Sequence, residues 1–341
     1  GYFTECLTAR LLCTLLYCLG TLAWPYATLF FGHQAAAAAG FCALAAAYVA
    51  CLDTRKPGLW TALAGALAGL AVITEVPALI SYVAVAAFLG VCRGYRRLGL
   101  YIAASLPPVA LQLAYNWACF GSPLRFGYEF EASPEFARPA GWVSLPRPAV
   151  AVALLLSRDK GLLVFSPYLV FAAAGLILAL RRPELLTRRL ALTCLGVFLA
   201  YFLYNAGHYM WWGGSCLGPR HIVPALPFLA FGLIFLPQGL SLVWRLLLTV
   251  TATWSVAVAW LGAATVSEPG PAIANSHVLE AGLSQLLSGT LDWPNLGLWL
   301  GLQGSATLVP QVVLAAALTL VLMHIAHRAD TAQDAGKPTP A

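Results

Sequence analysis

Charged residues are scarce in this sequence. Only 9% of the 341 residues are Asp, Glu, Lys or Arg, against about 25% in an ordinary soluble domain. A disordered chain and a nucleic-acid-binding module both need far more charge, so both are disfavoured. The nine cysteines are an odd number, and they include no Cys-x-x-Cys pair and no His/Cys spacing of zinc-site type. Neither a disulfide scaffold nor a zinc-binding module is therefore expected.

Apolar residues make up 60% of the chain. A membrane-spanning helix needs about 20 of them, and ten such helices would use roughly the apolar content present. The sequence predicts an all-α, polytopic integral membrane protein with about ten transmembrane helices in one domain, 1–327, and a cytoplasmic polar tail, 328–341. The pair Gly65-x-x-x-Gly69 suits close helix approach in lipid. The predicted spans are 6–24, 28–51, 59–74, 77–92, 98–119, 163–180, 190–210, 221–237, 243–264 and 309–327.

The start of the chain is Gly1, and no basic segment precedes the first apolar run. A cleaved signal peptide is therefore not expected, and a start inside a longer chain is consistent with this pattern.

Lys and Arg gather in alternate loops and so predict the orientation, because such loops stay in the cytoplasm. The inner side receives 13 of the 19 basic residues and five of the 13 acidic ones. The net charge of +6 therefore reads as an orientation signal and not as a nucleic-acid footprint. Two long segments, about 120–162 and 265–308, fall outside, which places the function at the extracytoplasmic face. The inner basic residues are Arg10, Arg55, Lys56, Arg93, Arg96, Arg97, Arg181, Arg182, Arg188, Arg189, Arg245, Arg328 and Lys337.

Several polar residues fall at the outer ends of predicted helices, where ionisable groups are costly and are functional candidates. The predicted topology puts all of them at the same depth. Each also has a simpler interpretation, since a histidine can be a hydrogen-bonded core residue and tryptophans form interfacial belts. These substrate-binding candidates are His33, Glu75, Asn116, His208, Trp211, Trp212 and Arg220.

Arg220 is the strongest single candidate. Its permanently charged fork matches a phosphate group, and a predicted helix N-terminus at this point would favour an anion. Trp211 and Trp212 would offer surfaces to a sugar or an isoprenoid. The alternative is an arginine that extends into the lipid headgroups.

The outer loop holds two further charged groups. Arg158 and Lys160 suit a phosphate, with Asp159 orienting one of them, or they form a solvated helix cap. Glu129 and Glu131, with Glu135, suit a general base or a divalent cation, or they form a solvated acidic loop. No metal site is predicted from spacing, and no cofactor is certain.

An ordered set of motifs resembles bacterial polytopic glycosyltransferases of the GT-C superfamily. The set is similar to the dolichyl-phosphate-mannose mannosyltransferase-like membrane proteins and covers about residues 6–237. The superfamily commonly carries its catalytic carboxylate in a first extracytoplasmic loop, which has no counterpart here, and Glu75 stands where relatives more often have a basic residue. The motifs are Leu19–Tyr26, Phe31–His33, Ala68–Thr74, Tyr115–Trp117, Phe120–Pro123, Gly161–Pro167, Trp211–Gly214 and Gly218–Arg220.

The resemblance implies an inverting transfer of a sugar from a polyprenyl-phosphate donor to a glycan, lipid or protein acceptor, at the outer face of a bacterial inner membrane. Arg220 would hold the donor phosphate, and Glu129, Glu131 or Asp159 would supply the base. Two alternatives stay open: a transporter or flippase of a lipid-linked saccharide, and a non-catalytic GT-C-like membrane subunit. Membrane lipid is the other expected partner, and nucleic acid is not.

Overall fold

The computed structural model describes residues 3–4, 6–130, 143–214, 216–237, 239–265, 278–291 and 294–335. Within these ranges every regular element is a helix, and the only β-type pairing is one antiparallel bridge between Val143 and His208. The expectation of an all-α fold is confirmed for this part of the chain.

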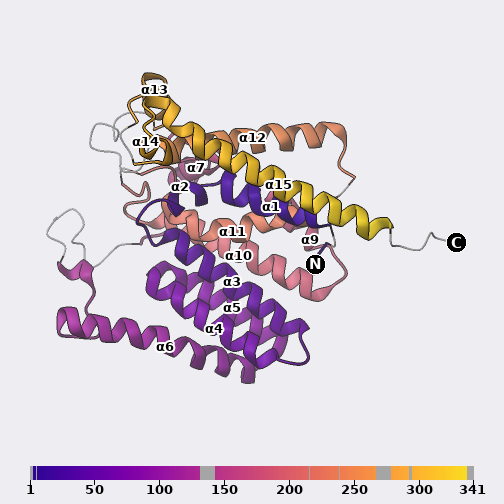
Figure 1. The fold of residues 1–341 in the computed structure, drawn as a ribbon. Helices are drawn as coiled ribbons and strands as arrows, with labels where there is room; N and C mark the ends of the chain where they lie inside the picture. Colours follow the sequence, from indigo (N-terminus) through magenta and orange to yellow (C-terminus); the bar gives the residue numbers. More distant parts are fainter. Residues whose placement is uncertain are drawn as a thin grey trace.

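The first half of the chain forms six α-helices and two short 3-10 helices. α6 runs along one edge of the molecule, next to α4 (Figure 1). The elements are α1 (Leu7–Gly20), α2 (Ala23–Ala27), α3 (His33–Leu52), α4 (Pro57–Thr74), η1 (Val76–Ala78), α5 (Leu79–Arg93), α6 (Tyr95–Phe120) and η2 (Gly127–Phe130).

The second half supplies the centre of the bundle and its opposite edge, where α15 crosses α1 (Figure 1). Its elements are α7 (Pro148–Leu156), α8 (Leu162–Phe165), α9 (Leu169–Ala179), α10 (Leu185–Gly207), η3 (Arg220–Ala225), α11 (Leu226–Ala230), η4 (Phe231–Phe235), α12 (Leu242–Thr265), α13 (Val278–Ser288), α14 (Leu296–Trp299), η5 (Gly304–Leu308) and α15 (Val309–Ala335).

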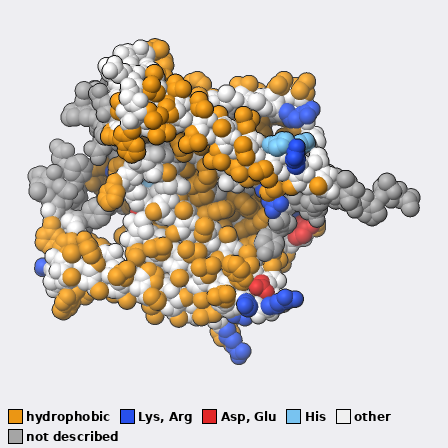
Figure 2. All heavy atoms as spheres, viewed as in Figure 1, with side chains coloured by type: hydrophobic (Ala, Val, Ile, Leu, Met, Phe, Trp, Pro, Cys, Tyr) orange, Lys and Arg blue, Asp and Glu red, His pale blue; other side chains and the backbone are white. Residues whose placement is uncertain are grey.

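Seven helical segments of the described chain are long and apolar enough to cross a membrane, fewer than the ten expected. Three other predicted spans are helical but shorter, at Leu7–Gly20, Leu169–Ala179 and Arg220–Phe235. Large apolar side chains are exposed along the long helices, and orange covers much of the face in Figure 2. Such a surface suits lipid and not water, so the chain has the character of an integral membrane protein. The seven segments are His33–Leu52, Pro57–Thr74, Val76–Arg93, Tyr95–Phe120, Leu185–Gly207, Leu242–Thr265 and Gly304–Ala332.

The segment 220–235 is not one regular helix but a succession of η3, α11 and η4, and we call it the broken segment. Pro224 and Pro227 lie inside it and remove backbone N–H donors that an α-helix needs. The segment is nonetheless mostly buried, and it packs closely on α9. Gly175 and Gly232 permit this contact, because a Cβ on Gly175 would lie 2.0 Å from the carbonyl oxygen of Gly232.

The close helix approach expected at Gly65-x-x-x-Gly69 is observed between α4 and α6. A Cβ on Gly65 would lie 2.1 Å from the carbonyl oxygen of Tyr101, and one on Gly69 would lie 2.9 Å from that of Ser105. Only glycine lets the two backbones come this near.

The first turn of α1 is capped by the last long helix. The Asp330 carboxylate on α15 accepts the backbone N–H groups of Leu7 (2.6 Å) and Thr8 (2.9 Å), and also the Cys6 thiol (3.3 Å). These are amide donors that a helix start leaves without an intrahelical partner.

The two ends of the bundle differ in charge. In Figure 2 the Lys and Arg side chains of the visible face gather mainly at the right-hand end, which we call the basic end. In Figure 1 the α3–α4 turn, the start of α10 and the start of α12 lie at this end, whereas α2, α13 and α14 lie at the other. The predicted clustering of basic residues in alternate loops therefore corresponds to one physical end of the molecule.

Candidate functional site

Five side chains from four separate parts of the chain meet at the end of the bundle opposite the basic end. We call His33, Glu75, His208, Arg220 and His221 the polar cluster. His33 begins α3, Glu75 follows the last residue of α4, and His208 follows the last residue of α10. Arg220 and His221 begin η3. Because each lies where a helix starts or stops, the helix packing alone brings them together.

His33 and Glu75 form a direct pair between His33 Nδ1 and a Glu75 carboxylate oxygen. Their side chains are only 10% and 15% exposed. Gly32 allows the approach, since a Cβ there would lie 3.0 Å from the Thr74 carbonyl oxygen and 3.1 Å from Glu75 Cγ. A carboxylate facing Nδ1 favours a proton on that nitrogen, which leaves Nε2 of a neutral ring as the acceptor. Phe31 stacks on the His33 ring at 5.7 Å.

The three imidazole rings form a chain of contacts. The centroids of His33 and His221 lie 5.8 Å apart, and those of His221 and His208 lie 5.1 Å apart. His208 Nδ1 accepts the N–H of Met210 at 3.1 Å, which places its own proton on Nε2. Burial lowers the pKa of His208, and the neighbouring charges of Arg220 and Arg147 act in the same direction. His208 is therefore a neutral ring at neutral pH.

Arg220 lies over the face of Phe31, with its Cζ 5.2 Å from the ring centroid. Its Nε is buried and has no hydrogen-bond partner among the described residues, and no described carboxylate lies within ion-pair distance. The Trp211–Gly214 loop covers the side chain. Gly213 has φ +73°, and a Cβ on it would lie 2.9 Å from Arg220 Cγ. The loop therefore needs glycine here both for its conformation and for its contact with Arg220.

Lys160 provides a second buried cation beside the polar cluster. Its Nζ donates to the carbonyl oxygens of Gly214 (3.1 Å) and Cys216 (2.5 Å), and it lies 3.5 Å from Cys216 Sγ. Burial lowers the pKa of Lys160, and the charge of Arg220 lowers it further while the adjacent Asp159 raises it. Because Gly214 and Gly213 are neighbours in the loop that contacts Arg220, the two cations lie beside the same loop.

Asn205, two residues before the end of α10, is fully buried, and neither polar atom of its amide has a partner among the described residues. His221 Nε2 is also buried without a described partner. Buried polar groups are normally hydrogen-bonded, so several unsatisfied groups at one place indicate a position for a polar ligand.

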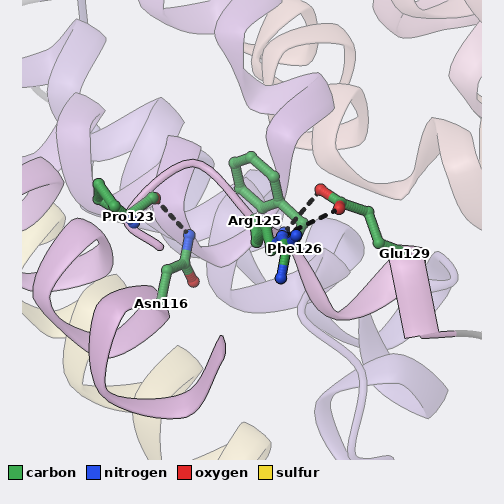
Figure 3. Close-up of polar contacts among 5 residues, drawn as sticks. All are labelled: Asn116, Pro123, Arg125, Phe126 and Glu129. Atoms are coloured by element: carbon green, nitrogen blue, oxygen red, sulfur yellow. Dashed lines mark hydrogen bonds and ion pairs between the residues drawn. The ribbon is translucent and has the colours of Figure 1, made fainter. Parts of the chain in front are cut away.

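Other candidates lie away from the polar cluster. Asn116 donates to the Pro123 carbonyl oxygen at 3.1 Å and so closes the turn after α6 (Figure 3). Glu129 is paired with Arg125 in the same exposed loop (Figure 3). Arg158 is paired with Glu280 of α13. Glu131 lies outside the described residues, as does Glu135.

Trp211 and Trp212 follow His208 closely and contact each other at a centroid distance of 6.2 Å. Trp212 is 42% exposed, so the loop that covers Arg220 itself presents an aromatic surface.

Some functional residues were not singled out from the sequence. Cys216 and Arg147 have no local pattern that marks them, because Cys216 acts through a contact with Lys160 and Arg147 through a hydrogen bond of 2.7 Å to the His208 carbonyl oxygen. His221 was visible only as the neighbour of Arg220.

The arrangement has a clear chemical preference. Three cations, Arg147, Lys160 and Arg220, lie near two carboxylates, Glu75 and Asp159, so the region favours an anion. Among the described residues, no group of three or more His, Cys, Asp or Glu side chains is arranged to hold a metal ion. The carboxylates that the sequence offered for a divalent cation are Glu129, whose partner is Arg125, and Glu131 with Glu135 in the segment 131–142, which lies outside the described residues.

Comparison with protein-family models, with curated proteins and with solved structures gives no match for this chain. The geometry of the polar cluster is therefore the basis for a proposal of function.

Proposed function

We propose that this protein is a membrane glycosyltransferase of GT-C type, which moves a sugar from a polyprenyl-phosphate donor to a hydroxyl acceptor. In this proposal the chain crosses a bacterial inner membrane about ten times, with the three shorter apolar segments completing the count. The polar cluster would lie at the extracytoplasmic face, and the acceptor would be a glycan, a lipid or a protein.

One observation carries the proposal: Arg220, whose Nε is buried, has no carboxylate within ion-pair distance among the described residues and lies beside the largely buried His33–Glu75 pair at one end of an apolar bundle. The guanidinium of Arg220 keeps an unused Nε donor, and the amide of Asn205 keeps both its donor and its acceptor. A phosphate oxygen supplies the missing acceptor, and a sugar hydroxyl supplies both kinds of partner. A ligand with an apolar tail would reach this end of the bundle through the surrounding lipid.

The transfer follows from these positions. His33, oriented by Glu75, takes the acceptor hydroxyl proton on Nε2 as its oxygen attacks the anomeric carbon. The bond from that carbon to the phosphate oxygen breaks, and its electron pair stays on the phosphate. Arg220 and Lys160 stabilise the negative charge that develops there. This assignment gives the base to a buried His–Glu pair in place of the exposed Glu129.

Trp211 and Trp212 are suited to the sugar. Pyranose rings expose apolar C–H faces, which pack against aromatic rings, and Trp212 offers such a face beside the Arg220 loop.

The phosphate assignment is tested by binding of farnesyl phosphate to the purified full chain, measured by thermal shift and native mass spectrometry. Arg220→Gln is expected to weaken binding by about tenfold to a hundredfold, because a charge-assisted hydrogen bond contributes about 1.5–3 kcal/mol. Arg158→Gln is the matched control, since Arg158 pairs with Glu280 away from the polar cluster. If Arg220→Gln and wild type bind farnesyl phosphate equally, Arg220 is not part of the binding site. If wild type binds farnesol as tightly as farnesyl phosphate, the site does not recognise the phosphate group.

A second candidate function, a transporter of a lipid-linked saccharide, is favoured by the broken segment. Discontinuous helices inside a membrane bundle are common where transporters hold their substrates. The two functions differ in their product. In proteoliposomes an enzyme releases polyprenyl phosphate without its sugar, whereas a transporter moves the intact lipid-linked sugar between the leaflets.

A further inference from the structure

Two cysteines lie at the ends of α3 and α5 that are opposite the polar cluster. Cys51 is the last residue but one of α3, and Cys92 is the last but one of α5. The two thiols are close enough to interact, and both residues are partly exposed. The approach is enforced by Arg93, which donates from Nε to the Ala50 carbonyl oxygen (3.1 Å) and from Nη2 to that of Cys51 (2.6 Å).

A second arginine reaches the same pair from a third helix. Arg189 of α10 places Nη1 at 3.8 Å from Cys92 Sγ and at 3.4 Å from the Val91 carbonyl oxygen. No carboxylate of the described residues lies within ion-pair distance of Arg189. An unneutralised guanidinium beside a thiol favours the thiolate, which is the reactive form. Cys92 is therefore the nucleophile of the pair, and Cys51 is the neighbouring thiol.

We propose that Cys51 and Cys92 are a redox-responsive dithiol, which hydroperoxides convert into a disulfide that joins α3 to α5. The Cys92 thiolate attacks the terminal peroxide oxygen, an S–O bond forms as the O–O bond breaks, and Cys92 becomes a sulfenic acid while hydroxide leaves from hydrogen peroxide or an alkoxide leaves from an organic hydroperoxide. The Cys51 thiol then attacks the sulfenic sulfur, an S–S bond forms, and water leaves with the proton of Cys51. The peroxide is reduced by two electrons and the two thiols are oxidised by two.

The disulfide would act on the same helices that carry the His33–Glu75 pair. α3 begins at His33 and carries Cys51 next to its last residue. α5 follows η1, which begins directly after Glu75, and it carries Cys92 next to its last residue. A covalent link at one end of the two helices restricts their separation at the other. An effect of the disulfide on activity rests on the proposed function. The formation of the disulfide does not depend on that function.

The experiment uses the full chain, purified in detergent, reduced, freed of reductant and treated with hydrogen peroxide. Remaining thiols are alkylated, and cross-linked peptides are mapped by mass spectrometry. The expected product is a Cys51–Cys92 peptide pair in wild type and in Cys119→Ser, a control at an exposed cysteine of α6. The proposal is overturned if Cys51 and Cys92 both remain alkylatable while other cysteines are oxidised.

Variants test the assigned roles. In Cys51→Ser, dimedone is expected to trap a sulfenic acid on Cys92, whereas in Cys92→Ser the corresponding adduct on Cys51 forms far more slowly. Arg189→Gln is expected to slow disulfide formation severalfold relative to the exposed Arg188→Gln. Equal rates would remove Arg189 from the site. The disulfide map of wild type decides the proposal even where a serine variant does not fold.

Discussion

Arg220 is half-buried, and its guanidinium packs against an aromatic ring. The Phe31 ring offers its negative face to the guanidinium, an interaction that contributes about 0.5–2 kcal/mol depending on desolvation. Gly213 closes over the aliphatic part of the side chain. The conformation of one loop glycine is thus coupled to the position of the cation on which the proposed phosphate binding depends.

Gly213→Ala is expected to destabilise the protein by about 1–2 kcal/mol through its left-handed φ, and in addition to displace Arg220. Gly214→Ala is the matched control, because Gly214 has φ +76° but a Cβ there meets nothing within 4 Å. Thermal unfolding and farnesyl phosphate binding are measured for both. We expect both variants to lose stability and only Gly213→Ala to lose affinity; the same affinity in the two would contradict the coupling.

The candidates that lie together in the polar cluster are those at helix ends. His33, Glu75, His208 and Arg220 could be expected to meet because their helices end at a common depth. Arg158 and Asn116 could not be assigned in this way. Arg158 pairs with Glu280, a contact between distant parts of the chain, and Asn116 satisfies a local turn at Pro123. Side-chain pairing of this kind is not encoded in hydropathy.

At the scale of elements, each predicted apolar span contains helix, but only seven helical segments of the described chain are long enough to cross a membrane, and backbone hydrogen bonding explains part of the difference. Hydropathy averages over a window and so registers 221–237 as one span. Pro224 and Pro227 withhold donors at particular positions, and the chain responds with 3-10 turns. The helix N-terminus that the sequence predicted at Arg220 is therefore not an α-helix start, since η3 is a 3-10 helix of only six residues. A helix dipole consequently does not support anion binding there. Its phosphate assignment depends on charge and on unused donors.

The α4–α6 contact gives a prediction for element packing. Gly65→Ala is expected to destabilise the fold by about 1–3 kcal/mol, because its Cβ would overlap the Tyr101 backbone, which cannot move as a flexible side chain does. Gly99→Ala on α6 is the control, since a Cβ there meets nothing within 4 Å and alanine favours a helix by about 0.5–1 kcal/mol. Denaturation in mixed micelles measures both; equal stability would show that α4 and α6 are not held by this contact.

At the scale of the whole molecule, charge divides the bundle into two unlike ends. The α3–α4 turn lies at one end of the bundle, and the start of α3, which is His33, lies at the other (Figure 1). The distribution of Lys and Arg along the sequence was sufficient to predict this division, because it depends only on the alternation of loops.

Sidedness is predicted from the same division. In spheroplasts and inverted vesicles, a membrane-impermeant maleimide is expected to label Lys56→Cys only from the cytoplasmic side. Leu145→Cys, at a position 87% exposed near the polar cluster, is expected to react only from the opposite side. The labelling of wild-type cysteines is subtracted as the control. Labelling of both positions from one side would contradict the proposed topology.

The cap of α1 has a consequence for the order in which the molecule is completed. The amides of Leu7 and Thr8 receive their acceptor from Asp330, more than 300 positions later in the chain. On the ribosome, the beginning of α1 emerges long before that carboxylate exists, so its first turn stays unsatisfied throughout synthesis. α1 is therefore completed only after α15 has been made, although it precedes α15 in the chain.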